Sequence, residues 1–406
     1  MKQKVINDPV HGFISINNDL IYKIIEHPYF QRLRRIKQLG LTDFVYPGAH
    51  HTRFHHAIGA YHLMRKALYT LQSKGVEITE EEALAAQIAI LLHDIGHGPF
   101  SHTLEHTLTK GVSHEYISIC YMEKLNKEFD GDLSLAIRIF RNDYHKLFLH
   151  QLVSGQLDVD RLDYLTRDSF FTGVSEGVIN YNRLIDMMDV VDNQMVVEAK
   201  GIYSVEKFLI SRRIMYWQVY LHKTVLCAEE MLIKIISRAQ FLMKKGIAVE
   251  GSQALSYFLQ KDITKLDFET NSKTLEQFSL LDDFDIIAAT KSWVNHKDKV
   301  LSFLCKSLIN RNLFKIKLQN EVLDETKIKS LKLDLAAKLE ISTEDVDYLV
   351  IANKITSYLY NPKLDTIKIL EKSGKVLDFG EASDQWSSLA MQKAVTKYYC
   401  CYPKLK

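Results

Sequence analysis

The segment TEEEALAAQIAILLHDIG, residues 79–96, constrains the fold of this chain more than any other stretch. It opens with a capping box, in which Thr79 is followed by Glu82 three residues later, and it then becomes apolar on every side of a helix. A helix that is apolar all round is buried in a protein core or spans a membrane. Because the apolar run falls short of the roughly 18 residues of a membrane span, the sequence predicts a buried helix that Gly96 ends.

This helix ends on polar side chains that burial alone does not call for. His93 and Asp94 are adjacent at its end, and His97 and His102 follow closely. An unpaired buried charge is costly, so these groups need partners. A salt bridge or a helix-end cap would satisfy either residue taken alone, whereas a reactive site would account for the whole cluster.

Helical periodicity continues along most of the chain. We expect helices over 55–75, which ends on Gly75, over 113–128 and over 155–173, and two more within 203–245. Residues 1 to about 230 are therefore expected to form one all-helical core. The predicted fold class is mainly α.

The last third of the chain has a different pattern. Short strands are expected over 313–320 and over 366–379, where a Ser-Gly turn joins two strands. Segment 343–355 fits a helix or a strand, and we favour a strand in its middle. We divide the chain into a helical core (1–230), a helical extension (231–300) and a smaller C-terminal α+β lobe (301–406).

Composition and charge limit the cellular compartment and the binding partners that we expect. The five cysteines form no CxxC motif, which argues against a disulfide framework and a zinc ribbon and favours a reducing cytosol. The N-terminus has no apolar signal region, so we expect a cytoplasmic protein without a membrane partner. The net charge of +2 demands no nucleic-acid partner, although the basic run QRLRRIKQ (31–38) leaves that partner open without favouring it.

Histidines and aspartates elsewhere in the chain complete a metal-ligand pattern. Four histidines cluster in HHTRFHH (50–56), and three aspartates cluster in LDVDRLDY (157–164). A distant His, an adjacent His-Asp pair and a distant Asp make a ligand set of two imidazoles and two carboxylates. Such a set suits Fe, Mn, Zn or Mg and leaves positions open for water and a phosphate oxygen.

The helix expected over 155–173 carries a functional face. Asp160, Tyr164 and Asp168 are spaced four residues apart, so they share one side of the helix, with Arg161 beside it. A carboxylate, an aromatic ring and a cation on one wall suit a phosphorylated ligand. A solvated charged face with a chance tyrosine is an equally good interpretation of this helix alone.

Further polar residues follow the His-Asp pair. His102 and Glu105 are three residues apart, and His114 opens the next expected helix. Histidine titrates near neutrality, and a glutamate beside one imidazole would orient it and raise its basicity. Beside a metal, His97, His102 and His114 would supply phosphate contacts and a general acid; each one alone is as readily a surface histidine.

The pattern resembles a known superfamily. His56, His93–Asp94 and Asp160 match the H…HD…D pattern of the HD-domain metal-dependent phosphohydrolases. The longer strings resemble its deoxynucleoside triphosphate triphosphohydrolases (dNTPases): NDPVHG (7–12), FQRLRRIKQLG (30–40), HDIGHGPFSH (93–102), DVDRLDYLTRD (158–168) and, in the C-terminal lobe, RNLFK (311–315). The resemblance covers residues 1–230 well and the remainder in patches.

The resemblance implies a fold, a cofactor and a reaction. The fold would be an HD-domain helical catalytic core with a smaller C-terminal α+β lobe, and the cofactor a divalent metal ion (Fe, Mn, Mg, Zn or Ni). The reaction would be hydrolysis of a dNTP to deoxynucleoside and triphosphate. The metal ligands would be His56, His93, Asp94 and Asp160.

The remaining roles follow from the same resemblance. The triphosphate would be held by Arg53, His97, His102, Arg161 and Asp168. The acid that protonates the leaving 5′ oxygen would be His114, paired with Glu105. The sugar and base would contact Gln38, Leu39, Tyr164 and Tyr220.

Some members of the family are regulated by nucleotides at tetramer interfaces, which implies a homodimer or homotetramer. The matching positions are Lys4, Val5, Asn7, Glu26, Gln31, Arg34, His222, Lys223, Arg311 and Lys315. A solvated basic surface explains these residues nearly as well as a regulatory nucleotide does.

Four positions depart from the family pattern. Glu105 stands in place of Asp and has a different reach, and Arg161 stands in place of Lys and binds phosphate with different geometry. Leu221 replaces a polar residue near the base and sugar, which puts substrate preference in doubt. Glu26 replaces Asp in the regulatory set, which puts its guanine preference in doubt.

Three functions remain open. The first is a dNTP triphosphohydrolase activated by a nucleotide. The second is an HD phosphohydrolase acting on another nucleotide, a monophosphate or a signalling nucleotide, which Leu221 leaves open. The third is a non-catalytic nucleotide sensor or nucleic-acid-binding protein, supported by the basic run at 31–38. The reactive histidines argue against the third, because a structural metal would not need them.

Overall fold

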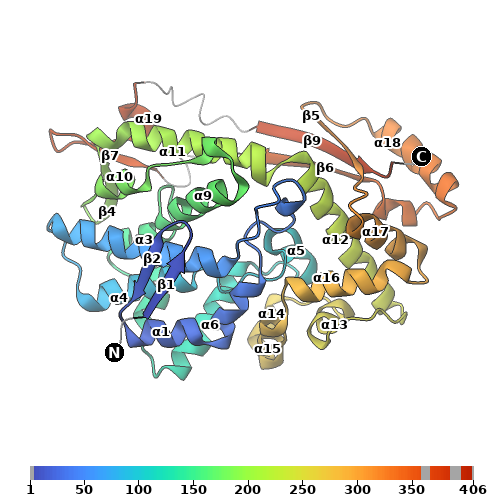
Figure 1. Ribbon diagram of the computed structural model, residues 1–406, viewed down its shortest axis with the longest axis horizontal. Coiled ribbons are helices and arrows are strands. Elements are labelled where there is room, and N and C mark those ends of the chain that lie inside the picture. The colour runs from blue at the N-terminus through green and yellow to red at the C-terminus, as the bar shows by residue number, and fades with distance from the viewer. Residues whose placement is uncertain (1–3, 358–365, 385–394, 405–406) are drawn as a thin grey trace.

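The computed structural model describes residues 4–357, 366–384 and 395–404. Within them the chain is mainly α, as the sequence predicts, with three small sheets (Figure 1). The helices of the first half are α1 (Asp19–Glu26), α2 (Pro28–Gln31), α3 (Arg53–Ser73), α4 (Glu80–Leu92), α5 (Ser101–Leu108), α6 (His114–Glu128), α7 (Ser134–Phe140), α8 (Leu147–Val153), α9 (Val159–Thr172) and α10 (Tyr181–Asp186). The helices of the second half are α11 (Ile202–Met215), α12 (Lys223–Lys244), α13 (Gln253–Gln260), α14 (Lys265–Thr270), α15 (Ser272–Leu280), α16 (Asp283–Ser292), α17 (Lys299–Ile309), α18 (Glu325–Leu339) and α19 (Phe379–Ala382).

The strands form hairpins and short ladders. They are β1 (Lys4–Asp8), β2 (Gly12–Ile16), β3 (Met188–Val191), β4 (Gln194–Glu198), β5 (Lys315–Gln319), β6 (Ile351–Ser357), β7 (Lys368–Leu370), β8 (Val376–Asp378) and β9 (Val395–Tyr402). The three sheets have the strand orders β1-β2, β3-β4-β7-β8 and β5-β9-β6.

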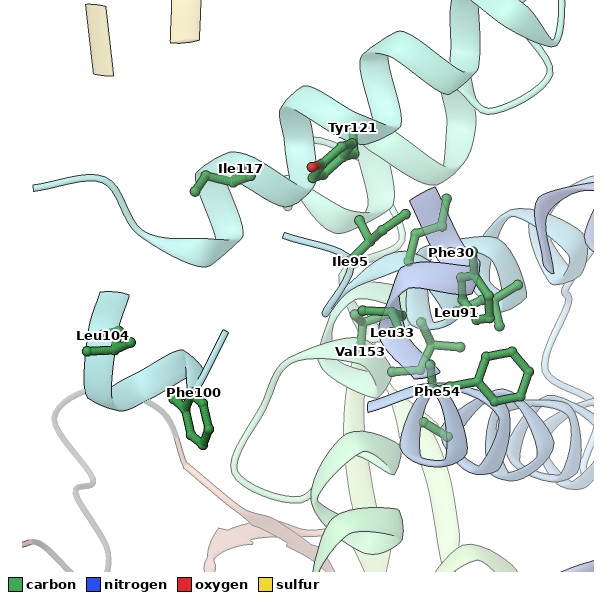
Figure 2. Packing of buried hydrophobic residues seen from close by; sticks show 14 of the residues in the cluster. Phe30, Leu33, Phe54, Leu91, Ile95, Phe100, Leu104, Ile117, Tyr121 and Val153 are labelled. Carbon is green, nitrogen blue, oxygen red and sulfur yellow. The ribbon is translucent and has the colours of Figure 1, made fainter. Parts of the chain in front are cut away.

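The predicted buried helix is α4, and its N-terminal capping box is present. It packs against α3, α7 and α8, and Figure 2 shows its Leu91 among Phe30, Leu33 and Phe54. These side chains belong to one continuous hydrophobic core. The apolar character of α4 on every side therefore reflects neighbours on several faces.

The expected end of this helix at Gly96 is four residues too late. The last helical residue is Leu92, and His93 is the C-cap. The glycine serves a different purpose, because a Cβ at Gly96 would lie 2.2 Å from the backbone oxygen of His114 and 2.3 Å from the backbone nitrogen of Ser118. Gly96 thus lets the turn after α4 press directly against the backbone of α6.

The other expected helices are present with shifted ends. Segment 55–75 is α3, segment 113–128 is α6, and 203–245 contains α11 and α12, joined through a π-helical turn at Tyr216–Tyr220. Segment 155–173 is α9, which begins only at Val159 because the side chain of Asp158 caps its N-terminus.

The expectation that residues 1–230 are all helical is wrong. The strands β1 and β2 form an antiparallel hairpin, in which Ile14 and Ile16 face the core. The strands β3 and β4 form a second hairpin, whose two-residue turn, Asp192-Asn193, has positive φ at both residues. That turn type matches the twist of paired strands, and a search for helical period misses such short elements.

The C-terminal strands are largely as expected. Segment 313–320 contains β5, and 366–379 forms the β7–β8 hairpin. In 343–355 a 3₁₀ turn at Asp345–Tyr348 comes first and β6 starts at Ile351, so the strand lies later than expected. The sheet β5-β9-β6 lies beside α18, whereas β7 pairs in parallel with β4 of the N-terminal part (Figure 1). The proposed domain limits stay a prediction.

No helix in the described ranges is both long enough and apolar enough to cross a membrane.

Candidate active site

A cavity of about 870 Å³ lies between the end of α4, helices α9 and α12 and the loops before α3 and α5. Most of the residues that the sequence assigned to chemistry and substrate line it. They are Gln38, Leu39, Arg53, His93, Asp94, His102, His114, Asp160, Arg161, Tyr164, Asp168 and Tyr220. His56, His97 and Glu105 stand directly behind this lining, in contact with it.

The four expected metal ligands come from three elements and meet at one point. The Nε2 of His56, on α3, lies 3.0 Å from Oδ1 of Asp160, on α9. The Nε2 of His93 lies 3.4 Å from the same oxygen and 3.3 Å from Oδ1 of Asp94. The two Nε2 atoms are 3.4 Å apart. The ligand atoms of His56, His93 and Asp94 thus lie close enough together to hold one cation, and the carboxylate of Asp160 lies against the two imidazoles.

The chemistry of these donors fits a bound cation. The Nδ1 of His56 faces Oδ2 of Asp163 at 2.8 Å, and the Nδ1 of His93 faces the carbonyl oxygen of Ile90 at 2.6 Å. Both partners only accept hydrogen bonds, so each Nδ1 carries a proton and each Nε2 is the nitrogen available to a cation. Lone pairs and carboxylate oxygens converging in a buried place require a positive charge between them. A divalent metal ion supplies that charge.

The acid–base behaviour of the cluster fits the same arrangement. Burial alone would lower the pKa of His56, but hydrogen bonds to Asp160 and Asp163 outweigh it and raise the pKa to about 10, so the carboxylates favour a positive charge at Nε2, either a proton or the metal ion that would replace it. Burial alone would raise the pKa of Asp94, but the charges of His93 and its other neighbours hold it well below its ordinary value. Burial alone would likewise raise the pKa of Asp160, but hydrogen bonds from His56 and His93 lower it, so both aspartates are ionised at neutral pH and able to bind a cation.

Arg53 binds the cluster as well as lining the cavity. Its Nη1 donates to Oδ2 of Asp94 at 2.6 Å, and the side chain is buried. The guanidinium thus holds a carboxylate of the candidate metal site on one side and faces the cavity on the other. Arginine always carries its charge, so this position supplies a fixed cation for an anionic ligand.

The three later histidines lie together on the opposite side of Asp94. The rings of His97 and His114 stack with centroids 3.8 Å apart, and His102 meets both edge-on. Glu105 accepts from the backbone N–H of His114 at 2.6 Å and lies 3.0 Å from its Nδ1. The longer glutamate side chain therefore reaches the histidine that the sequence paired it with.

His97 and His114 differ in surroundings. Burial and the charge of Arg53 hold the pKa of His97 well below its ordinary value, and Nε2 of His97 lies 3.2 Å from Oδ1 of Asp94. A neutral imidazole suits a hydrogen-bonding role. His114 has the carboxylate of Glu105 on one ring nitrogen, which fixes the orientation of the ring.

The predicted face of α9 is real. Asp160, Arg161, Tyr164 and Asp168 all line the cavity. The guanidinium of Arg161 is steadied by the carbonyl of Gly155 at 2.6 Å, and the arginine is partly exposed toward the cavity. The interpretation of this helix as a solvated charged face is therefore wrong.

Asp168 is held at both of its oxygens. The Nε2 of His51 lies 2.7 Å from Oδ1, and the hydroxyl of Tyr220 donates to Oδ2 at 2.7 Å. His51 is buried and stacks on the ring of Phe171. His51 belongs to the histidine cluster in the sequence, but nothing in the spacing singled it out as the partner of Asp168.

A buried aspartate positions two loops of the cavity at once. Oδ2 of Asp283, on α16, accepts from the backbone N–H of Lys37 at 2.8 Å, and Oδ1 accepts from that of Phe100 at 2.8 Å. The first loop leads to Gln38 and Leu39. The second leads to His102, and its Phe100 has a left-handed backbone (φ 45°), a conformation that non-glycine residues rarely adopt.

Three glutamates that the sequence did not single out line the cavity: Glu115, Glu229 and Glu230. Glu229, on α12, lines the cavity, and burial together with the neighbouring Glu230 raises the pKa of Glu229 to about 7, against a hydrogen bond from Thr103. Leu226 and Ile233 line the cavity from the same helix face. The spacing of three and four residues along α12 places these positions on one helix face, but a face that packs in an apolar core has the same spacing. The sequence pattern alone therefore could not mark this face as part of a cavity.

The ten regulatory positions, all within the described ranges, lie outside the cavity lining. One group is on β1 and the segment α1 to Arg35, where Gln31 accepts from Arg34 and Lys4 lies over the ring of Tyr22. The other group is at the start of α12 and near β5, where Arg311 donates to the carbonyl of Phe44. Figure 1 shows β1 and β5 well apart on this chain.

The basic run at 31–38 has partners within the protein. Arg32 is buried and donates to the carbonyl of His97, and Arg35 pairs with Asp282. Arg34 lies over the ring of Phe54, and Lys37 pairs with Asp43. Charges committed to internal partners do not form a nucleic-acid surface, which weakens the only sequence argument for such a partner.

Comparisons with known proteins agree with this geometry. Residues 53–168 match the model of the HD domain, and residues 179–250 match that of the HD associated region. A phosphohydrolase from Bacteroides thetaiotaomicron of known crystal structure is 53% identical and superimposes with a TM-score of 0.96, over 99% of this chain and 100% of that one. An uncharacterized protein of Bacillus subtilis, YwfO, is 31% identical over 99% of this chain and 93% of the relative.

Two relatives carry a named activity. The human deoxynucleoside triphosphate triphosphohydrolase SAMHD1 is 30% identical over 80% of this chain, and its Dictyostelium discoideum homologue is 35% identical over 59%. The chain spans 56% and 50% of the lengths of these two proteins. Together with the HD-domain match and the His-Asp cluster, these relationships identify the chain as an HD-domain, metal-dependent phosphohydrolase of the dNTPase family.

Proposed function

We propose that this protein hydrolyses deoxynucleoside triphosphates to deoxynucleoside and triphosphate. The observation that carries the proposal is the arrangement along one cavity of a candidate metal site, a cluster of cationic and imidazole groups, and a pocket of hydrogen-bonding and aromatic side chains. The metal site suits the α-phosphate, the cationic and imidazole groups suit the rest of the triphosphate, and the pocket of hydrogen-bonding and aromatic side chains suits the nucleoside. The relatives SAMHD1 and its homologue are named for this reaction.

The metal ligands of the proposal are His56, His93, Asp94 and Asp160. A divalent ion bound there would polarise the α-phosphate and lower the pKa of a water molecule. The four protein ligands leave room for both groups. Fixed cations nearby, Arg53 and Arg161, would neutralise the charge of the phosphate oxygens.

The histidine cluster divides its work in this proposal. His97 and His102 would contact the triphosphate, and His114, supported by Glu105, would protonate the 5′ oxygen as it leaves. An alkoxide is a poor leaving group, so a positioned acid contributes a large part of the rate. The Glu105 contact at 3.0 Å supports this role, since it holds the ring of His114 in one orientation.

We assign Asp168 to the sugar in preference to the triphosphate. A carboxylate repels phosphate, whereas it accepts hydrogen bonds from a sugar hydroxyl, and its hold by His51 and Tyr220 fixes its orientation. Gln38, Leu39 and Tyr164 would complete the sugar site. Leu221 also lines the cavity, so at that position the base meets an apolar side chain.

Nucleotide activation and a homodimer or homotetramer belong to the proposal as well. The two groups of regulatory residues lie apart on one chain (Figure 1), so a nucleotide that touches both would need a second copy of the chain. An activator and an oligomer are therefore proposed together.

Product identity tests the proposal. The purified protein is incubated with each dNTP, singly and mixed, with Mg, Mn or Fe, and the products are separated. We expect intact triphosphate and deoxynucleoside. Release of pyrophosphate or single phosphate instead would support a phosphohydrolase for another nucleotide, and no turnover with any mixture would support a non-catalytic sensor.

A further inference from the structure

The motif NDPVHG (7–12) is built into the structure immediately behind the candidate metal site. Its Asp8 is buried, and Oδ1 of this residue accepts from the backbone N–H groups of Val10 and His11 at 3.0 and 2.8 Å. The turn between β1 and β2 is thereby closed on an aspartate side chain. Oδ2 of Asp8 faces Arg167, whose Nη1 donates to it at 2.8 Å.

Arg167 and His11 both continue to a second buried aspartate. Arg167 donates from Nε to Oδ2 of Asp163 at 2.9 Å and from Nη2 to Oδ1 at 3.0 Å. The Nε2 of His11 lies 2.7 Å from Oδ1 of Asp163. The remaining partner of this carboxylate is Nδ1 of His56, at 2.8 Å from Oδ2. Each oxygen of Asp163 therefore has two donors, and the carboxylate has no freedom to rotate.

The packing around Asp163 is as tight as its hydrogen bonding. Asp163 and Arg167 have no exposed surface. On α3, Gly59 leaves the room that the pair occupies, because a Cβ there would lie 2.0 Å from Oδ1 of Asp163. His56 sits one helical turn earlier on the same face of α3.

We propose that Asp8, His11, Arg167 and Asp163 form a positioning network that sets the orientation and the protonated nitrogen of the metal ligand His56. Asp163 fixes Nδ1 of His56 as the donor, so that Nε2 presents its lone pair toward Asp160 and His93. Arg167 and His11 fix Asp163 in turn, and Asp8 ties them to the N-terminal turn. None of these four residues touches the cavity; they act through His56.

The network also contributes charge. Asp8 and Asp163 together carry one more charge than Arg167 balances, so these three groups place a net negative charge behind the ligand. A carboxylate behind a metal-bound imidazole makes that imidazole a better donor. This inference rests on the proposed function only in taking His56 as a metal ligand, and it holds for whichever phosphate ester the site cleaves.

Binding of Co²⁺ alone tests the network, read from its visible absorption during titration of the metal-free full-length protein. We expect Asp163→Asn to weaken Co²⁺ binding on the order of 10–100-fold and to change the absorption band, since an amide turned toward His56 disturbs its orientation. Asp8→Asn, three contacts away from His56, should weaken it less. His93→Ala reports on the site itself, because it removes a proposed ligand.

A matched control separates positioning from general stability. Asp298 also binds an arginine through both oxygens, Arg238 at 3.1 and 2.6 Å, and caps α17. Asp298→Asn should lower stability and leave the Co²⁺ affinity and spectrum unchanged.

Four results would overturn either the network or the metal site of the proposed function. Wild-type affinity and spectrum in folded Asp163→Asn would sink the network, and if that variant does not fold, wild-type behaviour of Asp8→Asn would sink it equally. Unchanged Co²⁺ binding in His93→Ala would instead overturn the metal site of the proposed function. A loss in Asp298→Asn equal to that in Asp8→Asn would reduce the network to a stability effect.

Discussion

Gly59 is the position where a usually favourable substitution should do harm. It lies inside α3, surrounded by the buried pair Asp163 and Arg167. Replacing a glycine in the interior of a helix by alanine normally stabilises the helix, by about 1 kcal/mol. At this position the added methyl group would lie 2.0 Å from Oδ1 of Asp163 and 2.2 Å from Nη2 of Arg167.

The magnitude follows from these two distances. Non-bonded heavy atoms prefer separations of about 3.5 Å, so the pair must move apart or away from α3 by more than about 1 Å. Breaking a buried ion pair costs about 3–5 kcal/mol. Subtracting the helix-propensity gain of about 1 kcal/mol leaves Gly59→Ala less stable than the wild type by about 2–4 kcal/mol.

Urea unfolding of the metal-free protein measures this difference directly. Ala60→Gly, at the next and equally buried position, is the matched control, and it should lose about 1 kcal/mol through helix propensity. Co²⁺ affinity should fall in Gly59→Ala and remain in the control, because only the first displaces Asp163. A Gly59→Ala protein as stable as the wild type would refute the reasoning.

Three further predictions concern the cavity. His93→Ala should lose the metal and all turnover, whereas His114→Ala should keep the metal by elemental analysis and lose turnover on the order of 10²–10⁴-fold; full activity of His114→Ala would exclude it as the acid. Glu229, with a pKa of about 7, becomes anionic as pH rises through neutrality, so KM for an anionic substrate should rise from pH 6 to 8 in the wild type and stay flat in Glu229→Gln. Asp283→Asn leaves one buried backbone N–H, that of Lys37 or Phe100, without an acceptor, so it should lower the free energy of unfolding by about 1–3 kcal/mol and raise KM. An unchanged KM would show that the loops of Lys37 and Phe100 keep their positions without this carboxylate.

The sequence predicts well where its signals are local. The face of α9 follows from a spacing of four residues, and Asp160, Tyr164 and Asp168 line the cavity as that spacing requires. The buried helix α4 follows from an apolar run and a capping box. In both cases the relevant neighbours lie within two turns of one helix.

The residues that support the site could not be predicted from patterns within one helix or strand. Asp163 binds His56 across 107 positions and His11 across 152, and no pattern within one element signals such a pair. Asp283 likewise reaches back to Lys37 across 246 positions. Side chains that orient other side chains across a packed core are brought together only by the fold. The sequence therefore predicts the metal ligands but not residues such as Asp163 and Asp283, which orient the groups of the site.

The two histidines of the candidate metal site are oriented by different kinds of hydrogen-bond acceptor. His56 depends on the ionised side chain of Asp163, whereas His93 directs its Nδ1 at the carbonyl of Ile90 in its own helix. The last carbonyls of a helix have no N–H partner within it, so the end of α4 supplies that acceptor from its backbone. A substitution can remove the acceptor behind His56 but not the one behind His93, which changes only if α4 itself moves.

Ser118 opposes such movement of α4, because its hydroxyl accepts from the N–H of Gly96 and donates to the carbonyl of His93. The burial of α4 on every side therefore serves the site as directly as its ligands do, since it fixes the backbone carbonyl that orients one of the two imidazoles.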